Sequence, residues 1–410
     1  MVADRGNLGI PSEISVGIVT PHKLQGYGVS VRLNREIYTY KKYSVPVTIF
    51  SLVENGLIHG CDVVSVSGIL GKVTEVIGFD RLVNSESVVR KLFLANRIKK
   101  IAKSMSSKIA RVSEKRKVTV FHCDDFLGSI ISLNVQNQMK SNPLIIGEFA
   151  DLIHLDFKER FGLKDADKLI INVREMLCET LEKMDFAFFV SPIDRDIAVK
   201  ELGIAKNRTC TLYEAADKKA PCKLKYRLTP SYVCYLGILA KWEYPHLLIE
   251  SYRYACANRK NLVYSIIGAG PLFKQMKKMA KDLGSRIIFY GWHPNSEALR
   301  IASDADLGVI PTLKVRAMPS KLFVYASLGL PMISMDGMWW SERFIRHYDI
   351  GYSAAHSPED LGNAIKTALN NPSELEEKGK RARKLIEEKY NWDLRTKKML
   401  KVYEKLLGMR

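Results

Sequence analysis

Residues 262–272 read LVYSIIGAGPL, and this stretch indicates the fold of the second half of the chain. Leu262 to Ile267 is an apolar run of the length typical of a buried strand. Gly268-Ala269-Gly270 follows it, and Pro271 opens a segment with helical spacing. A strand that enters a glycine loop and then a helix is the unit of a doubly wound α/β sheet, where a phosphate can approach the loop. The alternative is an ordinary tight turn, because a single GxG is weak evidence.

The same alternation continues on both sides of this stretch and predicts parallel sheets. In the second half we expect strands at 232–236, 262–267, 286–290, 307–310 and 331–335, and helices at 246–257, 271–283, 295–302, 321–327, 357–369 and 373–406. In the first half we expect strands at 16–20, 45–50, 118–122, 144–147 and 186–190, and a helix at 29–40. The 410 residues are enough for two domains. We place the linker in the polar, basic stretch 218–231.

The composition is that of a globular protein with an unusual charge. Lysine and arginine number 63 against 44 acidic residues, for a formal net charge of +19. Such an excess favours anionic partners, although part of it could be solvated lysine alone. The seven cysteines include no CxxC pair, so we expect reduced thiols in a cytoplasmic protein and no metal site. The first residues do not resemble a signal peptide, and no apolar stretch is long enough to span a membrane.

One helix is expected to carry much of the charge. In residues 91–117, apolar side chains recur at helical spacing among ten lysines and arginines, with Glu114 as the single acid. This pattern describes a basic amphipathic helix that could lie on an anionic membrane surface. The alternative is a helix packed on its own domain with a solvated face. Nucleic acid is not an expected partner, because no nucleic-acid-binding motif accompanies the charge.

Candidate ligand-binding residues follow several of the expected strands. Lys321 lies at the start of a helix, where a cation is disfavoured unless an anion is present, so it could hold a diphosphate. In the first half, Asp151 follows a strand and could act as a general base, or could simply be a helix N-cap. His122 and Asp124 end another strand, where they could line a binding site or be structural.

The order of motifs in the second half resembles that of GT4-type glycosyltransferases of the GT-B superfamily. The motifs are YLGILAKW (235–242), LLIESY (247–252), IIGAGPL (266–272), IIFYGW (287–292), ASDADLGVIPT (302–312), PSKLFVYASLGLPMIS (319–334), SPEDLGNAI (357–365) and YNWD (390–393). In the first half, IVTPHKLQGYG (18–28) resembles the family's glycine-rich loop, and FFVSPIDRDIAVKELGI (188–204) resembles its domain-closing segment. Some features are also similar to the xanthan glucuronosyltransferase subgroup.

The resemblance implies an α/β GT-B fold, in which two Rossmann-like domains with parallel sheets face a central cleft. Residues 1–222 would bind the acceptor, residues 223–390 would bind a nucleotide-diphospho-sugar, and a helix in 391–410 would cross back to the first domain. Such enzymes need no metal and no cofactor beyond the donor substrate. The implied function is transfer of a hexose-type sugar to a lipid-linked or membrane-associated glycan, by a peripheral protein on the cytoplasmic membrane face.

The resemblance also implies individual contacts. The donor-binding residues would be Gly237, Lys241, Gly268, Gly270, Trp292, Arg316, Ser320, Lys321 and Leu322. Asp151 would be the catalytic base, and the acceptor side would include Gly26, Gly28, His122 and Glu148.

Several positions depart from the family's pattern. The two glutamates that usually bind the donor read Arg316 and Val324 here, and the first donor loop has Ile238 and Glu243-Tyr244 in place of an arginine and a Lys-Gly pair. These departures leave open a non-catalytic GT-B relative that acts as a binding or scaffolding protein. A third reading is another GT-B enzyme, such as a sugar-nucleotide epimerase or a glycogen-synthase-like polymerase.

Overall fold

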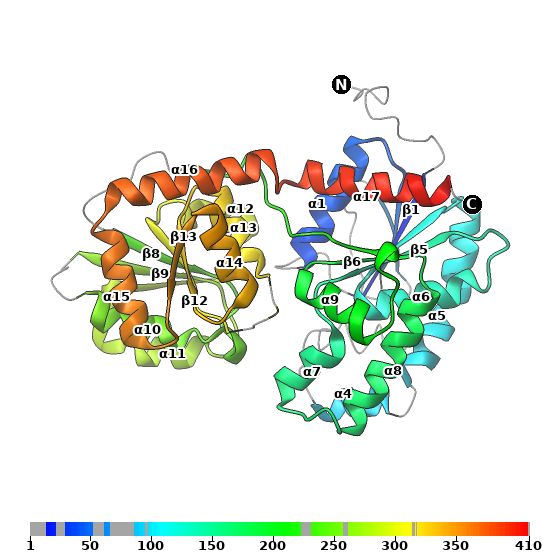
Figure 1. Ribbon diagram of the computed structural model, residues 1–410, viewed down its shortest axis with the longest axis horizontal. Helices are drawn as coiled ribbons and strands as arrows, with labels where there is room; N and C mark the ends of the chain where they lie inside the picture. Colours follow the sequence, from blue (N-terminus) through cyan, green and yellow to red (C-terminus); the bar gives the residue numbers. More distant parts are fainter. Residues whose placement is uncertain are drawn as a thin grey trace. The chain divides into compact units, whose positions relative to one another are not determined.

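The computed structural model describes residues 14–21, 29–51, 61–65, 86–94, 97–222, 231–256, 261–313, 316 and 318–408. The chain divides into two compact units, shown in Figure 1. Unit 1 comprises Met1–Tyr213 and Asp393–Arg410, and unit 2 comprises Glu214–Trp392. The chain therefore enters unit 2 once and then returns to unit 1.

The sheet of unit 1 has seven parallel strands in the order β3-β2-β1-β4-β5-β6-β7. The strands are β1 (Val16–Thr20), β2 (Val47–Ser51), β3 (Asp62–Ser65), β4 (Val120–Asp124), β5 (Leu144–Phe149), β6 (Phe186–Phe189) and β7 (Thr209–Thr211). The helices are α1 (Val29–Lys42), α4 (Glu86–Phe93), α5 (Arg97–Lys115), α6 (Asp125–Gln136), α7 (Ile153–Phe161), α8 (Lys168–Lys183), α9 (Pro192–Glu201) and α17 (Trp392–Leu407).

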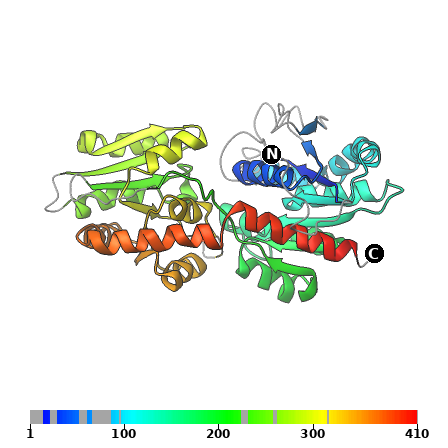
Figure 2. The ribbon, with the colours of Figure 1, turned by 90° about the horizontal axis from the view of Figure 1, so that it is seen from above.

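Helices cover both faces of this sheet, as Figure 2 shows. Alternate strand residues point to opposite faces, which gives the unit two separate cores. On one face, Ile18 and Ile146 pack with side chains of α1 and α17. On the other face, Phe121 and Ile145 pack with side chains of α5, α6 and α8. Helix α17 is thus part of the fold of unit 1, although it follows unit 2 in the sequence.

The sheet of unit 2 has six parallel strands in the order β10-β9-β8-β11-β12-β13. The strands are β8 (Ser231–Leu236), β9 (Leu262–Ile267), β10 (Ile287–Gly291), β11 (Leu307–Ile310), β12 (Met332–Met335) and β13 (Gly351–Ala354). The helices are α10 (His246–Ala255), α11 (Phe273–Met279), α12 (Asn295–Ala302), α13 (Ser320–Ser327), α14 (Trp339–Tyr348), α15 (Pro358–Leu369) and α16 (Pro372–Glu388), and the short 3-10 turns include η3 (Lys241–Glu243) and η4 (Lys281–Arg286).

The division between the units differs from the sequence-based boundaries of 222 and 390. Unit 2 begins at Glu214, because the segment that follows is bonded to the end of the α16 region. The Ala216 amide donates a 3.0 Å hydrogen bond to the Tyr390 carbonyl. The expected single helix at 373–406 is two helices, since Asn391 leaves the helical path and forms a β-bridge with Ala216.

Helix α5 contains most of residues 91–117, for which the sequence left two alternatives open: a membrane-surface helix or a helix packed on its own domain. The structure shows the second. Its apolar residues Ile98, Met105 and Ile109 are buried in the core of unit 1 and are not available to lipid. Nine basic side chains on and just after α5 remain exposed: Arg97, Lys99, Lys100, Lys103, Lys108, Arg111, Lys115, Arg116 and Lys117. Of the two alternatives, the structure therefore favours a helix that packs on its own domain with a solvated face, and the apolar side of α5 is not a surface that could contact lipid. Its periodicity reports burial within its own unit.

Two further sequence expectations concern the whole chain. All seven cysteines lie in the described residues, and none of them forms a disulfide. Within the described ranges, every helix is too short or too polar to cross a membrane.

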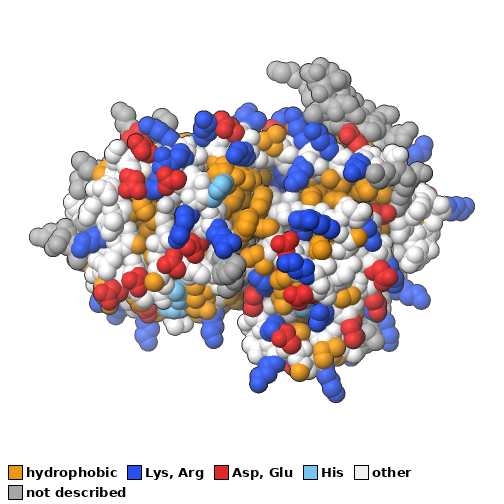
Figure 3. All heavy atoms as spheres, viewed as in Figure 1, with side chains coloured by type: hydrophobic (Ala, Val, Ile, Leu, Met, Phe, Trp, Pro, Cys, Tyr) orange, Lys and Arg blue, Asp and Glu red, His pale blue; other side chains and the backbone are white. Residues whose placement is uncertain are grey.

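On the face shown in Figure 3, basic and acidic side chains are interspersed, so the positive excess is not gathered there into one patch.

Candidate functional site

The strand orders place the candidate sites at the carboxyl edges of the two sheets. In a doubly wound sheet, ligands bind where the strand order reverses, because the connections on either side of that point diverge. In unit 2 this point lies between β8 and β11, and in unit 1 it lies between β1 and β4. The segments that follow β8 and β11 contain Gly237 and Lys321, and Asp124 ends β4.

In unit 2, the loops after β8 and β9 cross each other in direct contact. A Cβ atom on Gly268 would lie 1.9 Å from the carbonyl oxygen of Gly237, and one on Gly270 would lie 2.5 Å from that of Leu239. The Leu239 amide also donates a 3.0 Å hydrogen bond to the Ala269 carbonyl. Gly268 and Gly270 are thus required by loop packing, which supports the tight-turn reading of GxG and holds the β8 loop at the sheet edge.

Lys321 is the buried cation of this edge. Its side chain is 9% exposed, and Nζ forms an ion pair with a carboxylate oxygen of Glu243. Nζ also lies 4.7 Å from the centre of the Tyr235 ring, and a Cβ atom on Gly237 would be 3.2 Å from Nζ. The structure therefore brings Lys321 and Gly237 together, as an anion site would require, but it adds a carboxylate that neutralises the lysine.

The other residues expected to bind the donor differ in how far their side chains are exposed to solvent. Trp292, which follows β10, is 57% exposed, and Lys241 in η3 and Ser320 at the start of α13 are also exposed. Arg316 is buried. Leu322 is fully buried in the core, so its side chain serves packing and is not placed to contact a ligand.

In unit 1, five charged side chains form a buried cluster on the sheet face that α1 and α17 cover. Its members are Arg32 and Glu36 of α1, Asp124 of β4, Glu148 of β5 and Arg395 of α17. His122 of β4 lies among them. Every one of these side chains is at most 3% exposed.

The contacts of the cluster link the two helices to the sheet. Arg395 donates from Nη2 to Glu148 at 2.7 Å and from Nη1 to Glu36. Arg32 Nη2 donates to Asp124 at 3.0 Å, and Arg32 Nε lies 2.9 Å from Glu148. The Thr20 hydroxyl at the end of β1 also donates to Asp124, at 2.6 Å. Each carboxylate of the cluster therefore has a guanidinium beside it.

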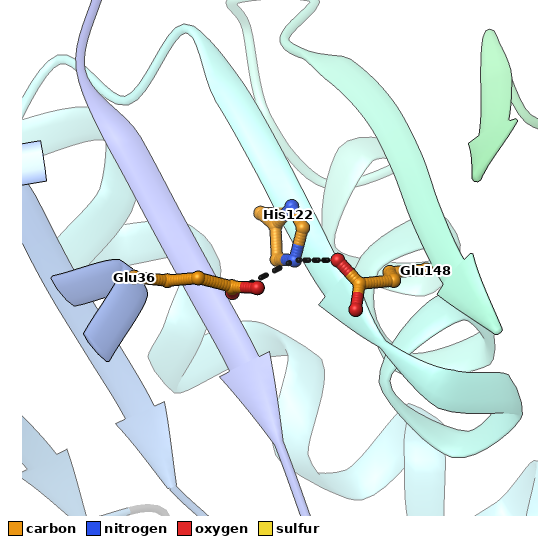
Figure 4. Close-up of side chains that lie close together, drawn as sticks. All are labelled: Glu36, His122 and Glu148. Atoms are coloured by element: carbon orange, nitrogen blue, oxygen red, sulfur yellow. Dashed lines mark ion pairs between the residues drawn. The ribbon is translucent and has the colours of Figure 1, made fainter. Parts of the chain in front are cut away.

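His122 joins this cluster to a pair of buried tyrosines. Its Nδ1 lies 2.8 Å from the Tyr403 hydroxyl, which lies 2.9 Å from the Tyr40 hydroxyl. Its Nε2 faces carboxylate oxygens of Glu148 at 3.5 Å and Glu36 at 3.7 Å, as Figure 4 shows. Burial lowers the His122 pKa to about 4, although the Glu148 charge opposes the shift. Arg32 and Arg395 lower the Glu148 pKa to about 2 against the effect of burial.

Glu36, His122 and Glu148 offer three ligand atoms within 4.8 Å of one another, which is a donor set that could hold a metal ion. The surrounding charges argue against a divalent ion here. Arg395 already binds both carboxylates, and Arg32 supplies a second positive charge. Two guanidiniums beside three carboxylates instead form an ion-pair network, and His122 lies next to two of these carboxylates.

The remaining acceptor-side residues have separate surroundings. Asp151 is partly exposed after β5, and the N-cap of α7 is Leu152, so the N-cap reading of Asp151 is wrong. His122 and Glu148 are fully buried and hold other side chains. Gly26 and Gly28 lie outside the described residues.

Sequence reasoning missed Arg32, Glu36, Arg395 and Tyr403. A signal was present in α1, where Arg32 and Glu36 are one helical turn apart and adjoin the core residues Leu33 and Ile37. Charged residues beside the apolar side of a helix can be recognised as buried only when the oppositely charged residues that they contact are known. Those partners lie on β4, β5 and α17, far away in the sequence.

Comparison with known proteins agrees with this architecture. Residues 218–391 match the family model of glycosyl transferases group 1. Over 217 residues the chain is 24% identical to an uncharacterized glycosyltransferase of Methanocaldococcus jannaschii. That match spans 52% of this chain and 54% of the relative, so it covers about half the length of each.

Solved structures resemble the chain over nearly its whole length. A sucrose-phosphate synthase from Thermosynechococcus elongatus gives a TM-score of 0.72 at 15% identity, covering 97% of this chain and 100% of that one. HepE from Anabaena, solved in complex with UDP and glucose, gives 0.69 at 11% identity, covering 95% and 99%. At such identities the likeness concerns the fold, and it confirms the expected pair of Rossmann-like halves.

Proposed function

We propose that this chain transfers a hexose-type sugar from a nucleotide-diphospho-sugar to a lipid-linked or membrane-associated glycan. The premise is its GT-B fold, together with the match of residues 218–391 to the family model of glycosyl transferases group 1. The observation that carries the donor half is the position of Lys321, a buried cation beside Gly237 at the strand-order reversal of unit 2. HepE, a structural neighbour, was solved in complex with UDP and glucose, which supports a nucleotide as a ligand of this fold.

In this proposal, unit 2 binds the donor through its diphosphate. Lys321 and the N-terminus of α13 neutralise the leaving diphosphate, because a helix N-terminus and a desolvated ammonium both favour negative charge. Trp292 stacks on the nucleobase, and Lys241 and Arg316 are further cations along the same segments. These groups would let the reaction proceed without a metal.

On the acceptor side, we assign the role of general base to Asp151. It follows β5 at the carboxyl edge of unit 1 and is partly exposed, so its carboxylate can reach an acceptor hydroxyl. The buried cluster that includes Glu148 and Arg32 holds the end of β5, the strand that precedes Asp151. Asp151→Asn should lower kcat by about a hundredfold or more and leave nucleotide binding unchanged.

The membrane half of the proposal rests on the charged side of α5. Because its apolar side is buried, attraction to anionic lipid on the cytoplasmic membrane face would be electrostatic and would weaken with salt. The protein should sediment with phosphatidylglycerol vesicles at low salt and not with phosphatidylcholine vesicles. Exchange of Lys100, Lys103 and Arg111 for glutamine should abolish this, whereas exchange of Lys380 and Lys384 on α16 should not.

A panel of UDP, GDP and ADP sugars tests the donor half. At least one should raise the melting temperature of the wild type and be consumed with lipid-linked acceptors. Lys321→Ala should lose this shift, and Lys384→Ala, an exposed lysine of the same unit, should keep it. If no nucleotide sugar binds, the proposal is refuted.

The Lys321–Glu243 ion pair favours a second candidate, a non-catalytic GT-B relative that binds a partner without turnover. Release of a nucleoside diphosphate that Asp151→Asn abolishes would rule out this candidate. An epimerase would give a changed nucleotide sugar and no transferred product.

A further inference from the structure

The ion pair between Lys321 and Glu243 alters the charge of the proposed donor site. The Lys321 and Glu243 side chains are 9% and 15% exposed, and Nζ also faces the Tyr235 ring. A buried lysine with a carboxylate partner presents no net charge to an incoming anion. A diphosphate that binds here must either displace the Glu243 carboxylate from Nζ or tolerate it nearby.

The backbone directly after Glu243 forms a tight turn. Tyr244 adopts φ 48° and ψ 42°, the left-handed conformation that favours glycine. The Tyr244 amide donates a 3.2 Å hydrogen bond to the Lys241 carbonyl, which closes this turn. Glu243 therefore lies at a sharply defined point of the loop after β8.

Neighbouring contacts fix η3, the turn that carries Glu243. The Thr312 hydroxyl, just after β11, donates a 3.1 Å hydrogen bond to the Trp242 carbonyl, and the Glu243 amide donates to the Ala240 carbonyl at 3.0 Å. The backbone of η3 is therefore held by hydrogen bonds from both sides of the strand-order reversal, and none of them uses the Glu243 side chain. Removing its charge should leave the loop in place.

We propose that Glu243 is the counter-ion of the empty donor site, which holds Lys321 until the donor diphosphate replaces it. Glu243 then sets the affinity of unit 2 for nucleoside diphosphates and favours their release after sugar transfer. This inference rests on the proposed function, because it assumes that the ligand at this edge is a nucleotide sugar. It assigns Glu243 a positioning and specificity role, exerted through Lys321.

Titration calorimetry of UDP, GDP and ADP against the wild type, Glu243→Gln and Glu243→Lys tests this role. For the nucleotide that the wild type binds, Glu243→Gln should bind about tenfold or more tightly, because a unit charge close to a diphosphate has been removed. Glu243→Lys should bind more tightly still. The corresponding uncharged nucleoside should bind all three proteins equally, which a merely structural change would not produce.

Kinetics supply a second readout. In Glu243→Gln, the inhibition constant of the nucleoside diphosphate product should fall about as much as its dissociation constant, and kcat should fall while KM does not rise. Glu374→Gln, which removes one of the two acidic partners of Lys378 on α16 and leaves Asp349, is the matched control and should change none of these values. Unliganded melting temperatures identify a variant that fails to fold.

The outcomes separate this inference from the proposed function. If the wild type binds a nucleoside diphosphate and both Glu243 variants bind it no more tightly, the counter-ion role is overturned and the proposed function stands. If the wild type shows no binding and Glu243→Gln does bind, both are supported. If no variant binds any nucleotide, the proposed function fails and this inference fails with it.

Discussion

Arg395 donates a 2.7 Å hydrogen bond to Glu148, a residue 247 positions earlier in the sequence, and both side chains are buried. The same guanidinium binds Glu36 of α1. One arginine therefore ties α17 to the internal strand β5 and to helix α1. This arrangement makes α17 a structural part of unit 1.

Replacing Arg395 tests how far unit 1 depends on this contact. Arg395→Met should lower the free energy of unfolding by roughly 3–5 kcal/mol, because it leaves two buried carboxylates without their shared partner. Urea unfolding followed by circular dichroism measures the loss. Lys401→Met, at an exposed position on the same helix, should change stability by at most about 0.5 kcal/mol. A loss below about 1 kcal/mol for Arg395→Met would show that the cluster relaxes without it.

The buried histidine predicts a pH dependence. The His122 pKa is lowered from 6.5 to about 4, so the unfolded chain binds a proton at this residue before the folded protein does. Stability should therefore fall as pH decreases from about 6.5 to about 4, by roughly 3 kcal/mol for this group. The Glu148 pKa is lowered to about 2, so its contribution is lost at still lower pH, between about 4.5 and 2.

Unfolding free energies measured from pH 7.5 to pH 4 in the wild type and in His122→Gln check this sign. The variant should lose most of the decline between pH 6.5 and pH 4. If wild-type stability stays level or rises over that range, His122 is protonated in the folded protein, held between Glu148 and Glu36.

The crossing of the β8 and β9 loops predicts unequal costs for two glycine substitutions in unit 2. Gly268→Ala should destabilise the unit by about 3 kcal/mol or more, because the new methyl group overlaps the Gly237 carbonyl. Gly284 has φ 56° but nothing within 4 Å of a new Cβ, so Gly284→Ala should cost only about 1–2 kcal/mol. Thermal unfolding of the two variants compares them. Equal costs would mean that backbone conformation alone requires Gly268.

Replacement of Trp292 should weaken nucleotide binding without lowering the stability of the protein. Its ring is 57% exposed, so Trp292→Ala should leave the melting temperature of the free protein unchanged. If the ring stacks on a nucleobase, nucleotide affinity should fall about five- to a hundredfold, as other base–aromatic contacts suggest. Tyr254→Ala, which removes another exposed aromatic ring of unit 2, should leave affinity unaltered. Equal binding by wild type and Trp292→Ala would remove this residue from the donor site.

Local sequence patterns predict the fold well, because strands, helices and turns depend mainly on residues that are close together in the sequence. The spacing of apolar residues indicates which side of an element is buried, and glycine and proline indicate turns. The apolar run before Gly268 is strand β9, and the pattern that restarts after it recurs through β11 and β12. The same patterns could not decide what the apolar side of α5 contacts, since lipid and a protein core select the same spacing. In the structure that side is buried against its own unit.

The candidate sites depend on pairings that a single sequence does not contain. The change of sign at Glu243 was visible, but its partner Lys321 is 78 residues away and on another element. In the same way, Arg395 could be assigned to an amphipathic helix, while the carboxylates it binds remained unknown. Ion pairs between distant elements therefore limit what sequence reasoning can establish about a site.

The return of the chain to unit 1 has a consequence for synthesis on the ribosome. Residues up to Tyr213 leave the ribosome first, yet the sheet face that Met399, Leu400 and Tyr403 cover stays open until α17 has been made. Unit 2, a continuous segment, can complete its fold while unit 1 still waits for its last helix. The first half of the protein to be translated is thus the last to be finished, and until then its exposed apolar face is a target for chaperones.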